Sequence, residues 1–520
     1  MDSLYQRFSD KVNGLIKGFD RIVFKGFLRP IMFSAGMQLF LKTHGILNKD
    51  YKSFITSQSE KIIESANCYS KEHCGSEIRY ISSCNIRKED LVHEHQRKSG
   101  IKHGLVGIWS CVESCSTFRA RYDASLKYPQ IKSEQSRCKH LYFYFDHIDY
   151  GFMSVRLQTW APYNIQIAIN GREWLRRSLD KEGCSYIING NKFLHIDDYA
   201  LAQKLLEAQL DTKWCDMLNE FIPLVFPSMH NIFGDQMTYY WTMWQSEWAQ
   251  DYIFDSPKEL SSHIANILKY AFITGTSDRV LRYFGRPVKK DGQPHPLSKP
   301  ELFTRVNLWQ DGMRIRHWVD KNSVKLYNDQ NVLRIEMTMN NPGKYLIYRN
   351  IQGDSSLSKK LLPMRKGISD VAIRAKVSDD RIKSFAEHIS TIENKEPISD
   401  LISHVSQRKT SNGKSFRGLD ITGKDLELLK AISDPIFDVD HITNKALQQI
   451  LGAMSWSNGM KGKRLSSRIS RHLRLLREHG IIKKVSRQHK YYLTAKGRKL
   501  TTAINVIMSV SIEDLLKTVA

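Results

Sequence analysis

The sequence predicts an α+β protein, in which an antiparallel-sheet body with helical insertions precedes a small, basic C-terminal domain. Apolar and polar residues alternate with a period of two within 105–170 and again within 313–348, which is typical of β-strands. Between these stretches apolar residues recur at spacings of three and four, which indicates helices. Lys and Arg are concentrated beyond residue 460. The length of 520 residues suits several domains of ~100–200 residues each.

We expect four regions along the chain. They are a mixed α/β region (1–104), the α+β body (105–390), a linker (391–418) and the C-terminal domain (419–520). The linker prediction rests on a polar stretch that contains Gly and Ser. A further loop is predicted at 285–300, which holds four prolines.

Individual elements follow from local composition. Successive strands are expected in "LVGIWSCVE", "STFRARYD", "HLYFYFDH" and "FMSVRLQTWAPYNIQIAIN", because each is rich in aromatic and β-branched residues. Helices are expected in "FITSQSEKIIESANCYSKEH" and in "GREWLRRSLDKEG", which ends at Gly183. "DDYALAQKLLEAQLDTKWCDMLNEFI" and "YYWTMWQSEWAQDYIF" are also predicted to be helical. "NSVKLYNDQNVLRIEMTMNNPG" is predicted to form an antiparallel hairpin.

Charge is the strongest global signal. Lys and Arg number 78 against 54 acidic residues, which gives a formal net charge of +24. Such an excess favours a polyanionic partner, because every phosphate that is neutralised releases condensed counterions. Nucleic acid is the first candidate partner, and an anionic membrane surface is the second.

The cellular compartment can be narrowed from what the sequence lacks. Eight cysteines in 520 residues do not make a disulfide framework. The first 27 residues are charged throughout, without the apolar core of a signal peptide. No stretch reaches the ~18 uninterrupted apolar residues of a membrane helix. We therefore expect a cytoplasmic protein with reduced thiols and no membrane-spanning segment.

The C-terminal domain is predicted to contain three helices and a β-hairpin. The helices correspond to "TGKDLELLKAISD", to "TNKALQQILGA" with Thr443 as its N-cap, and to "RLSSRISRHLRLLREHG". "IIKKVSRQHKYYLTAKGRKL" then alternates like a strand, a basic turn and a second strand. From 461 to 499 there are fourteen Lys or Arg and a single acid, Glu478. The third helix has an apolar stripe of Leu465, Ile469, Leu473 and Leu476, and a basic stripe of Arg464, Arg468 and Arg471.

This order of elements resembles a winged helix-turn-helix domain over about residues 420–505. The resemblance implies that the third helix enters a major groove of double-stranded DNA and that the hairpin contacts phosphates or a minor groove. RNA is the alternative ligand, since a basic helix also fits an RNA backbone. A domain that binds protein or packs on its own chain is a further alternative. The residues that the resemblance assigns to nucleic acid are Arg464, Arg468, Arg471, Lys483, Lys484, Arg487 and Lys490.

A tyrosine in the predicted hairpin suggests covalent chemistry. "KLYNDQNVLRIEMTMN" resembles, over about fifteen residues, a block of rolling-circle replication initiator proteins. The resemblance implies that Tyr327 attacks a DNA phosphodiester, with Glu336 in the same site. That family's lysine, two positions after the tyrosine, is Asp329 here, and the only His-x-His is His93-Glu94-His95 in a predicted helix. The alternative is a half-buried strand tyrosine.

Carboxylates suggest metal chemistry. Glu247 and Asp251 are four residues apart in a predicted helix, which sets both on one face. Asp146 and Glu336 add carboxylates from predicted strands. Together these four residues are candidate ligands for Mg²⁺ or Mn²⁺ in phosphodiester cleavage, and Glu247, Asp251, Glu336 and Tyr327 are the candidate catalytic residues. The alternative is a pair of surface acids beside an apolar tryptophan stripe.

Two further candidate sites lie in the predicted sheet. Cys111, Cys115, Cys138 and His140 have ligand types that zinc accepts, although buried free thiols are the alternative. Aromatic residues in the strands suit the stacking of unpaired bases, with arginines for phosphates, although such residues also fill cores. The stacking candidates are Tyr142, Tyr144, Trp160 and Tyr163, and the candidate arginines are Arg156, Arg172 and Arg334.

These features favour a DNA-binding protein. We expect its body to cut or join DNA phosphodiesters, in the manner of a replication initiator or transposase of a mobile element, or to organise a nucleoprotein complex. Two alternatives stay open: an RNA-binding protein of a ribonucleoprotein particle, and a non-enzymatic DNA-binding regulator. Walker loops, Rossmann glycine patterns and nucleophile elbows are absent from the sequence.

Overall fold

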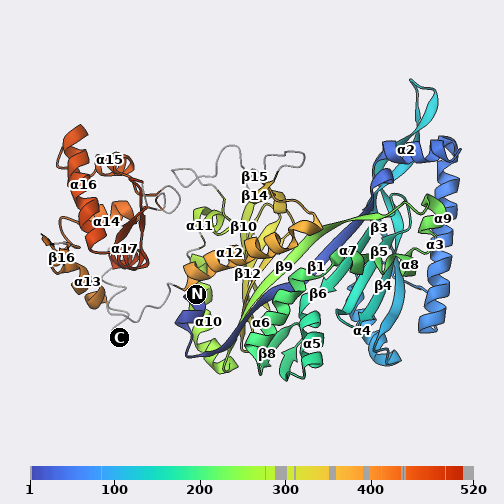
Figure 1. Cartoon of the computed structure of the whole chain (residues 1–520), viewed down its shortest axis with the longest axis horizontal. Helices are drawn as coiled ribbons and strands as arrows, with labels where there is room; N and C mark the ends of the chain where they lie inside the picture. Colours follow the sequence, from blue (N-terminus) through green and yellow to red (C-terminus); the bar gives the residue numbers. More distant parts are fainter. Residues whose placement is uncertain are drawn as a thin grey trace. The chain divides into compact units, whose positions relative to one another are not determined.

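The computed structural model describes most of the chain between residues 3 and 507 (Figure 1). The segments outside the described residues are 1–2, 84, 274, 276, 287–300, 310–311, 351–358, 391–397, 412, 435–436, 438–440, 486–487 and 508–520. The chain divides into two compact units, one of residues 1–269 and 301–386 and one of residues 270–300 and 387–520. The predicted α+β class is confirmed, and most strand pairs are antiparallel.

The first unit is built on an eleven-stranded sheet. Its strand order is β10-β11-β12-β13-β9-β1-β6-β5-β4-β3-β2, and only β2 runs parallel to its neighbour. The strand β1 from the first thirty residues therefore lies in the middle of the sheet, between β9 and β6. The strand bounds are β1 Val12–Leu28, β2 Arg79–Tyr80, β3 Gly104–Asp123, β4 Tyr128–His147, β5 Gly151–Gln158, β6 Ile165–Asn170, β9 Tyr239–Phe254, β10 Leu302–Trp309, β11 Gly312–Val319, β12 Asn322–Asp329 and β13 Val332–Met339.

We call the two sides of this sheet the front face and the back face. The front face carries Asp20, Lys25, Glu247 and Glu336. Part of it is covered by α5 (Gly171–Glu182), α6 (Tyr199–Ala208) and the hairpin of β7 (Tyr186–Asn189) and β8 (Lys192–Ile196), around a shared apolar core. Glycine permits this approach, because a Cβ on Gly18 would lie 2.7 Å from the Leu206 side chain.

Helix α12 (Val371–Ile389) packs on the back face. The buried Arg374 guanidinium donates to the carbonyl oxygen of Met243 at 2.6 Å and to that of Met339, so it ties α12 to β9 and β13. The His317 ring of β11 lies 5.6 Å from that of Phe385. One face of the central strands is thus sealed by a helix, whereas part of the front face stays accessible.

The prediction of a helix over Tyr239–Phe254 is wrong, because this stretch forms the sixteen-residue strand β9. Its tryptophans and tyrosines fit the helical spacing, but they also suit a strand that is buried on both faces. Pairing with β1 on one side and β13 on the other satisfies its backbone. Tertiary pairing therefore overrides the local pattern.

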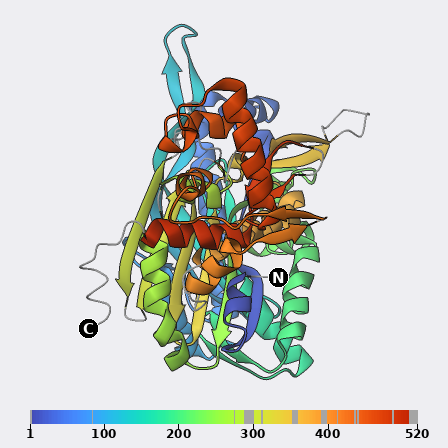
Figure 2. The same cartoon turned by 90° about the vertical axis from the view of Figure 1, so that its left-hand side faces the viewer.

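Several other predicted elements are confirmed. Helix α3 spans Tyr51–Cys74 and α4 spans Lys88–Ser99, and α5 ends at Gly183, whose φ is 68°. The predicted 322–343 hairpin is β12 and β13. The strands β3 and β4 are longer than expected and extend past β5 as a two-stranded ribbon (Figures 1 and 2).

The first unit contains further short elements. They are α1 (Ser3–Arg7), α2 (Ser34–Thr43), α7 (Trp214–Asn219), α8 (Ile222–Val225), α9 (Met229–Phe233), β14 (Leu346–Asn350) and β15 (Lys359–Pro363). Helix α10 (Pro257–Ile273) begins in the first unit and ends in the second, to which α11 (Ser277–Tyr283) belongs. The seven described cysteines are all free thiols. In the described part of the chain, no helix combines the length and the apolar character needed to cross a bilayer.

The second unit has a separate apolar core. Its helices are α13 (Ile398–Ser406), α14 (Leu426–Ile432), α15 (Asn444–Leu451), α16 (Gly462–Glu478) and α17 (Ala495–Ile507). Its hairpins pair β16 (Lys409–Ser411) with β17 (Lys414–Phe416) and β18 (Ile482–Lys484) with β19 (Tyr491–Leu493). The stretch predicted as a linker therefore contains α13 and a hairpin, while 391–397 and most of the predicted 285–300 loop lie outside the described residues.

Candidate metal centre and basic surface

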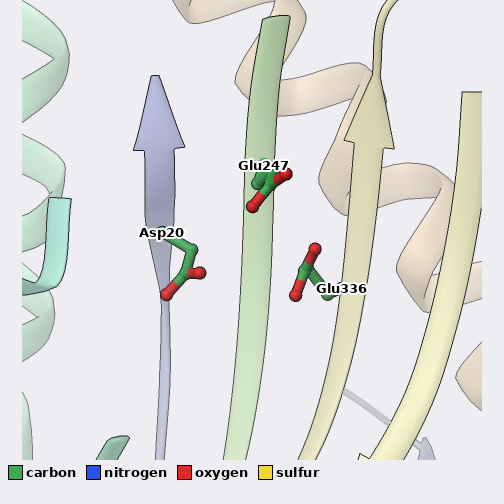
Figure 3. A group of neighbouring side chains, drawn as sticks. All are labelled: Asp20, Glu247 and Glu336. Carbon is green, nitrogen blue, oxygen red and sulfur yellow. The ribbon is translucent and has the colours of Figure 1, made fainter. Parts of the chain in front are cut away.

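Three carboxylates from adjacent strands converge on the front face. They belong to Asp20 of β1, Glu247 of β9 and Glu336 of β13, and one oxygen of each lies within 4.8 Å of the others. Figure 3 shows the three side chains directed toward one shared space. Asp20 and Glu336 are buried, whereas Glu247 is partly exposed. We call this group the carboxylate triad.

Strand register explains why these residues meet. In the β1–β9 pair, Phe19 faces Trp248 and Arg21 faces Glu247, so Asp20 is the extra residue of a β-bulge. A bulge turns a side chain out of the regular alternation, and here it brings the Asp20 carboxylate toward β13. Glu336 pairs with Ala249, two positions from Glu247 on the same face of β9.

A buried guanidinium supports the triad from within the sheet. Arg334 donates to Asp251 through Nε at 2.5 Å and through Nη2 at 2.8 Å, and to Asp20 through Nη1 at 2.9 Å. Its Nη2 also reaches the carbonyl oxygen of Asn191 at 2.9 Å. The Nη2 of Arg172 lies 3.0 Å from Asp251 and 3.0 Å from the carbonyl oxygen of Ala249. Both arginines are buried, so these charges are compensated without water.

Glu336 is held as a carboxylate. Burial opposes its ionisation most strongly, yet the ion pair with Lys325, the charge of Arg334 and a hydrogen bond from Tyr327 together lower the pKa of Glu336. Similarly, Arg334 and Arg172 overcome burial and lower the pKa of Asp251.

The pKa values of Asp20 and Glu247 are raised, in contrast to those of Glu336 and Asp251. Burial, followed by the charge of Glu336, raises the pKa of Glu247. Burial also raises the pKa of Asp20, against the attraction of Arg334. Gln245 donates a hydrogen bond to Glu247 at 2.8 Å, and among the described residues Glu247 forms no ion pair within 4.0 Å. Burial therefore opposes the ionisation of both Asp20 and Glu247, although Arg334 acts against it at Asp20, and Lys325 and Arg21 act against it at Glu247.

This donor set can hold a hard divalent cation. Carboxylate oxygens are the ligands that Mg²⁺ and Mn²⁺ prefer, and a cation would stabilise the ionised form of Glu247, whose pKa is raised first by burial and then by the charge of Glu336. Within the described residues, no other group of three or more His, Cys, Asp or Glu side chains brings its ligand atoms so close. The residues present therefore fit a divalent metal ion.

Two of the four carboxylates predicted as metal ligands lie outside the triad. Asp251 and Glu247 are four residues apart on a strand, which separates them by roughly 13 Å. The Asp251 carboxylate is instead occupied by two arginines. Asp146 lies on β4, beyond β6 and β5, where Arg177 donates to it at 2.6 Å and Gln96 at 2.9 Å.

Tyr327 lies beside the triad on β12. Its hydroxyl donates to Glu336 at 3.2 Å, and the guanidinium of Arg314 lies 4.6 Å from its ring centroid. Burial, the largest cause, raises the pKa of Tyr327 well above the usual value of about 10. The phenol therefore keeps its proton unless a base removes it, and Glu336 is the nearest carboxylate.

The zinc candidates do not form such a group. Cys111 faces His140 across β3 and β4, while Cys138 faces Glu113. Burial lowers the pKa of His140 to about 4, which keeps its imidazole neutral. The four side chains share one face of β3 and β4, and the thiols of Cys115 and Cys138 are hydrogen-bonded to each other, but no three of the four bring their ligand atoms within 4.8 Å of one another. Cys111 and Cys138 are buried, as expected for structural thiols.

Most of the aromatic residues and arginines that were predicted to bind nucleic acid contact other side chains of the body instead. Tyr144 and Tyr163 are buried, and the Tyr142 hydroxyl donates to Glu113, which also accepts from Arg156 at 2.7 Å. Trp160 has the Arg119 guanidinium at 5.4 Å from its ring centroid. Arg172 and Arg334, expected to contact nucleic acid, are instead buried in the ion-pair network described above.

The basic helix of the second unit presents its arginines unequally. Arg464 and Arg471 are exposed, whereas the Arg468 guanidinium stacks on the Trp456 ring with a centroid distance of 4.3 Å. Leu465, Ile469, Leu473 and Leu476 are buried as predicted. Thr443 caps α15, as expected, by accepting a hydrogen bond from Ala446 at 3.1 Å. Lys483, Lys484 and Lys490 are exposed, and Arg487 lies outside the described residues.

Asp20 was not recognised from the sequence as a site residue. It lies in "GLIKGFDRIVFKGF", where one acid interrupts an otherwise apolar and basic strand. That interruption is the signal that marks it, but a bulge and the pairing with Glu247 cannot be read from local sequence. Glu247 and Glu336 were predicted as metal ligands, and they are members of the triad.

Comparison with known proteins adds no family to these observations. The chain matches no protein-family model, no curated protein and no solved structure.

The first prediction concerns Glu247→Gln in the absence of divalent metal. Because the folded-state pKa of Glu247 is raised, its ionised form costs stability at neutral pH, and this cost vanishes below the ordinary glutamate pKa of about 4.3. In EDTA we expect the variant to be more stable than the native chain at pH 7, with the difference closing as the pH falls toward 4. Thermal unfolding at several pH values measures this.

Added Mn²⁺ should make the native chain more stable than the Glu247→Gln variant. A bound ion stabilises the native chain by about 2.7 kcal/mol at a free concentration one hundred times its dissociation constant. The Gln variant should gain far less. Glu64→Gln, at an exposed acid of α3, is the matched control and should follow the native chain. Equal Mn²⁺ shifts for Glu247→Gln and the native chain would contradict the metal site.

Proposed function

We propose that the protein binds DNA and cuts or joins its phosphodiester bonds with the help of a divalent metal ion held by the carboxylate triad. The observation that carries this proposal is the convergence of Asp20, Glu247 and Glu336, whose carboxylate oxygens lie within 4.8 Å of one another in a mostly buried group. Metal-assisted phosphoryl transfer requires oxygen ligands of this kind.

The residues around the triad have distinct tasks in this chemistry. A bound divalent ion polarises a phosphoryl oxygen and lowers the pKa of a water ligand. Lys325 and Arg334 keep Glu336 and Asp20 in position. Arg316 of β11 is half-buried and is attracted by both Glu336 and Glu247, although burial lowers its pKa. A guanidinium there suits the negative charge that develops on a pentacoordinate phosphate.

Tyr327 is the candidate nucleophile for a covalent variant of this reaction. Its hydroxyl already donates to Glu336, so the proton has an acceptor when the oxygen attacks phosphorus and the 3′- or 5′-oxygen of the DNA leaves. The raised pKa of Tyr327 counts against spontaneous ionisation. Hydrolysis, in which water is the nucleophile and the carboxylate triad would hold the ion, is therefore the main proposal, and transfer to Tyr327 is the second.

The second unit supports the DNA part of the proposal. Helices α14, α15 and α16 precede the β18–β19 hairpin, and an isolated bridge joins Ile442, between α14 and α15, to Tyr491 of β19. This order is similar to that of a winged helix-turn-helix domain. We propose that α16 lies in a major groove with Arg464 and Arg471 toward the DNA, and that the hairpin contacts phosphates.

For the chemistry, we predict nicking of supercoiled plasmid DNA that requires Mg²⁺ or Mn²⁺. Glu336→Gln and Glu247→Ala should reduce the rate by at least ~10²-fold, because each removes a carboxylate ligand of the ion. Tyr327→Phe should leave hydrolysis nearly unchanged, whereas loss of nicking together with loss of a protein–DNA adduct would assign the covalent route. Gel electrophoresis with and without protease measures both. Absence of nicking with every divalent metal would leave a non-enzymatic DNA-binding regulator.

For the C-terminal unit, we predict that Arg464→Ala with Arg471→Ala weakens duplex DNA binding. Each lost phosphate contact should reduce the slope of log affinity against log salt concentration by ~0.9. Lys52→Ala with Lys61→Ala, at exposed lysines of α3, is a charge-matched control. Fluorescence anisotropy at several salt concentrations measures the slopes. Unchanged duplex affinity would remove α16 from the proposal, and stronger binding to structured RNA than to DNA would favour a ribonucleoprotein component.

A further inference from the structure

Two lysine ammonium groups converge on one tryptophan of the front face. The Nζ atom of Lys366 lies 3.4 Å from the ring centroid of Trp244, and that of Lys25 lies 4.6 Å from it. Lys25 belongs to β1 and Trp244 to β9, and the carbonyl oxygen of Lys366 accepts a hydrogen bond from Met243 at 2.8 Å. Main-chain contacts therefore hold the three side chains together.

Strand register puts this group on the same face as the triad. Lys25 faces Thr242, and Arg21 faces Glu247, four residues earlier on β1. Trp244 is the extra residue of a bulge, because the neighbouring pairs join Val23 to Gln245 and Phe24 to Met243. Three residues of β9 separate Trp244 from Glu247, which corresponds to roughly 10 Å.

The two ammonium groups have no acidic counterpart. In the described part of the chain, neither Lys25 nor Lys366 forms an ion pair with a carboxylate within 4.0 Å. Burial, the largest cause, and the charges of Arg374 and Lys25 together lower the pKa of Lys366 to about 8. Burial and the charge of Arg156 lower the pKa of Lys25. An anion bound between these two lysines would relieve their repulsion and favour their charged forms.

Exposed aromatic rings accompany these cations. Trp244 and Tyr240 are each 40% exposed, although large aromatic side chains are usually buried in a sheet of this size. Tyr240 faces Phe27 across the β1–β9 pair, and the guanidinium of Arg29 lies 3.6 Å from its ring centroid. Exposed rings interleaved with Lys and Arg are typical of surfaces on which unpaired bases stack while the phosphates are neutralised.

We propose that Lys25, Arg29, Tyr240, Trp244 and Lys366 bind an unpaired DNA strand and lead its backbone to the carboxylate triad. We call these five residues the strand patch. The proposal rests on the proposed phosphodiester chemistry and names its substrate as single-stranded DNA. Bases of a duplex are stacked on each other and do not reach these rings, so the exposed aromatic surface favours an unpaired strand over a duplex.

The test is equilibrium binding of the full chain to fluorescently labelled oligothymidine in EDTA at several salt concentrations. We expect Lys25→Ala with Lys366→Ala to weaken binding at least ~10-fold and to reduce the salt slope by ~0.7 per lost contact. Trp244→Ala should weaken binding about tenfold through lost stacking, and Trp244→Phe should retain most of the affinity. Thermal unfolding of each variant checks that the fold is intact.

The controls separate this proposal from the proposed chemistry and from the C-terminal unit. Lys52→Ala with Lys61→Ala should bind oligothymidine like the native chain. Arg464→Ala with Arg471→Ala should weaken duplex binding far more than oligothymidine binding. Because EDTA removes divalent ions, binding is measured without cleavage, so intact strand binding with no nicking would contradict the chemistry alone. Native-like oligothymidine binding by the Lys25/Lys366 variant, or tighter binding of oligouridine, would overturn the strand patch as a DNA site.

Discussion

The rest of the first unit depends on the buried guanidinium of Arg334. It joins Asp251 of β9 and Asp20 of β1, residues far apart in the sequence, from its own position on β13. Arg172 of α5 shares Asp251, which ties a covering helix to the same network. Charges this deeply buried persist only when all partners are present, because removing one partner of a buried pair costs about 3–5 kcal/mol. The network therefore fixes the relative positions of three strands and one helix.

The same network sets the charge of the candidate metal centre. Asp20 belongs both to the arginine cluster and to the carboxylate triad, so the position of β1 against β13 determines the geometry of the triad. Lys325 forms an ion pair with Glu336, whereas Glu247 forms none within 4.0 Å among the described residues, and burial raises its pKa. This difference distinguishes the triad, a candidate metal site, from the ion pairs around it.

Sequence reasoning reached the fold class and part of the site. The β12–β13 hairpin, α5 with its terminal Gly183, and the Thr443 cap follow from local rules, because turn and cap chemistry acts over a few residues. It failed at Tyr239–Phe254, where the aromatic residues fit both a helical and a strand periodicity. Only the pairing with β1 and β13 makes this stretch a strand. Glu247 and Glu336 were identified by residue type. The role of Asp20 could not be predicted, because it depends on a bulge in the β1–β9 pair. The burial of Arg334 could not be predicted either, because it depends on the packing of α5 on the sheet.

The central claim is that Asp20, Glu247 and Glu336 together hold one divalent ion. Anomalous diffraction from crystals grown with Mn²⁺ tests it most directly, because the ion is located without reference to activity. The account predicts one strong anomalous peak between the three carboxylates, at coordination distances to oxygen, and its loss in crystals of Glu247→Gln. Well-ordered carboxylates with no peak between them at saturating Mn²⁺, or a peak unchanged by Glu247→Gln, would contradict it.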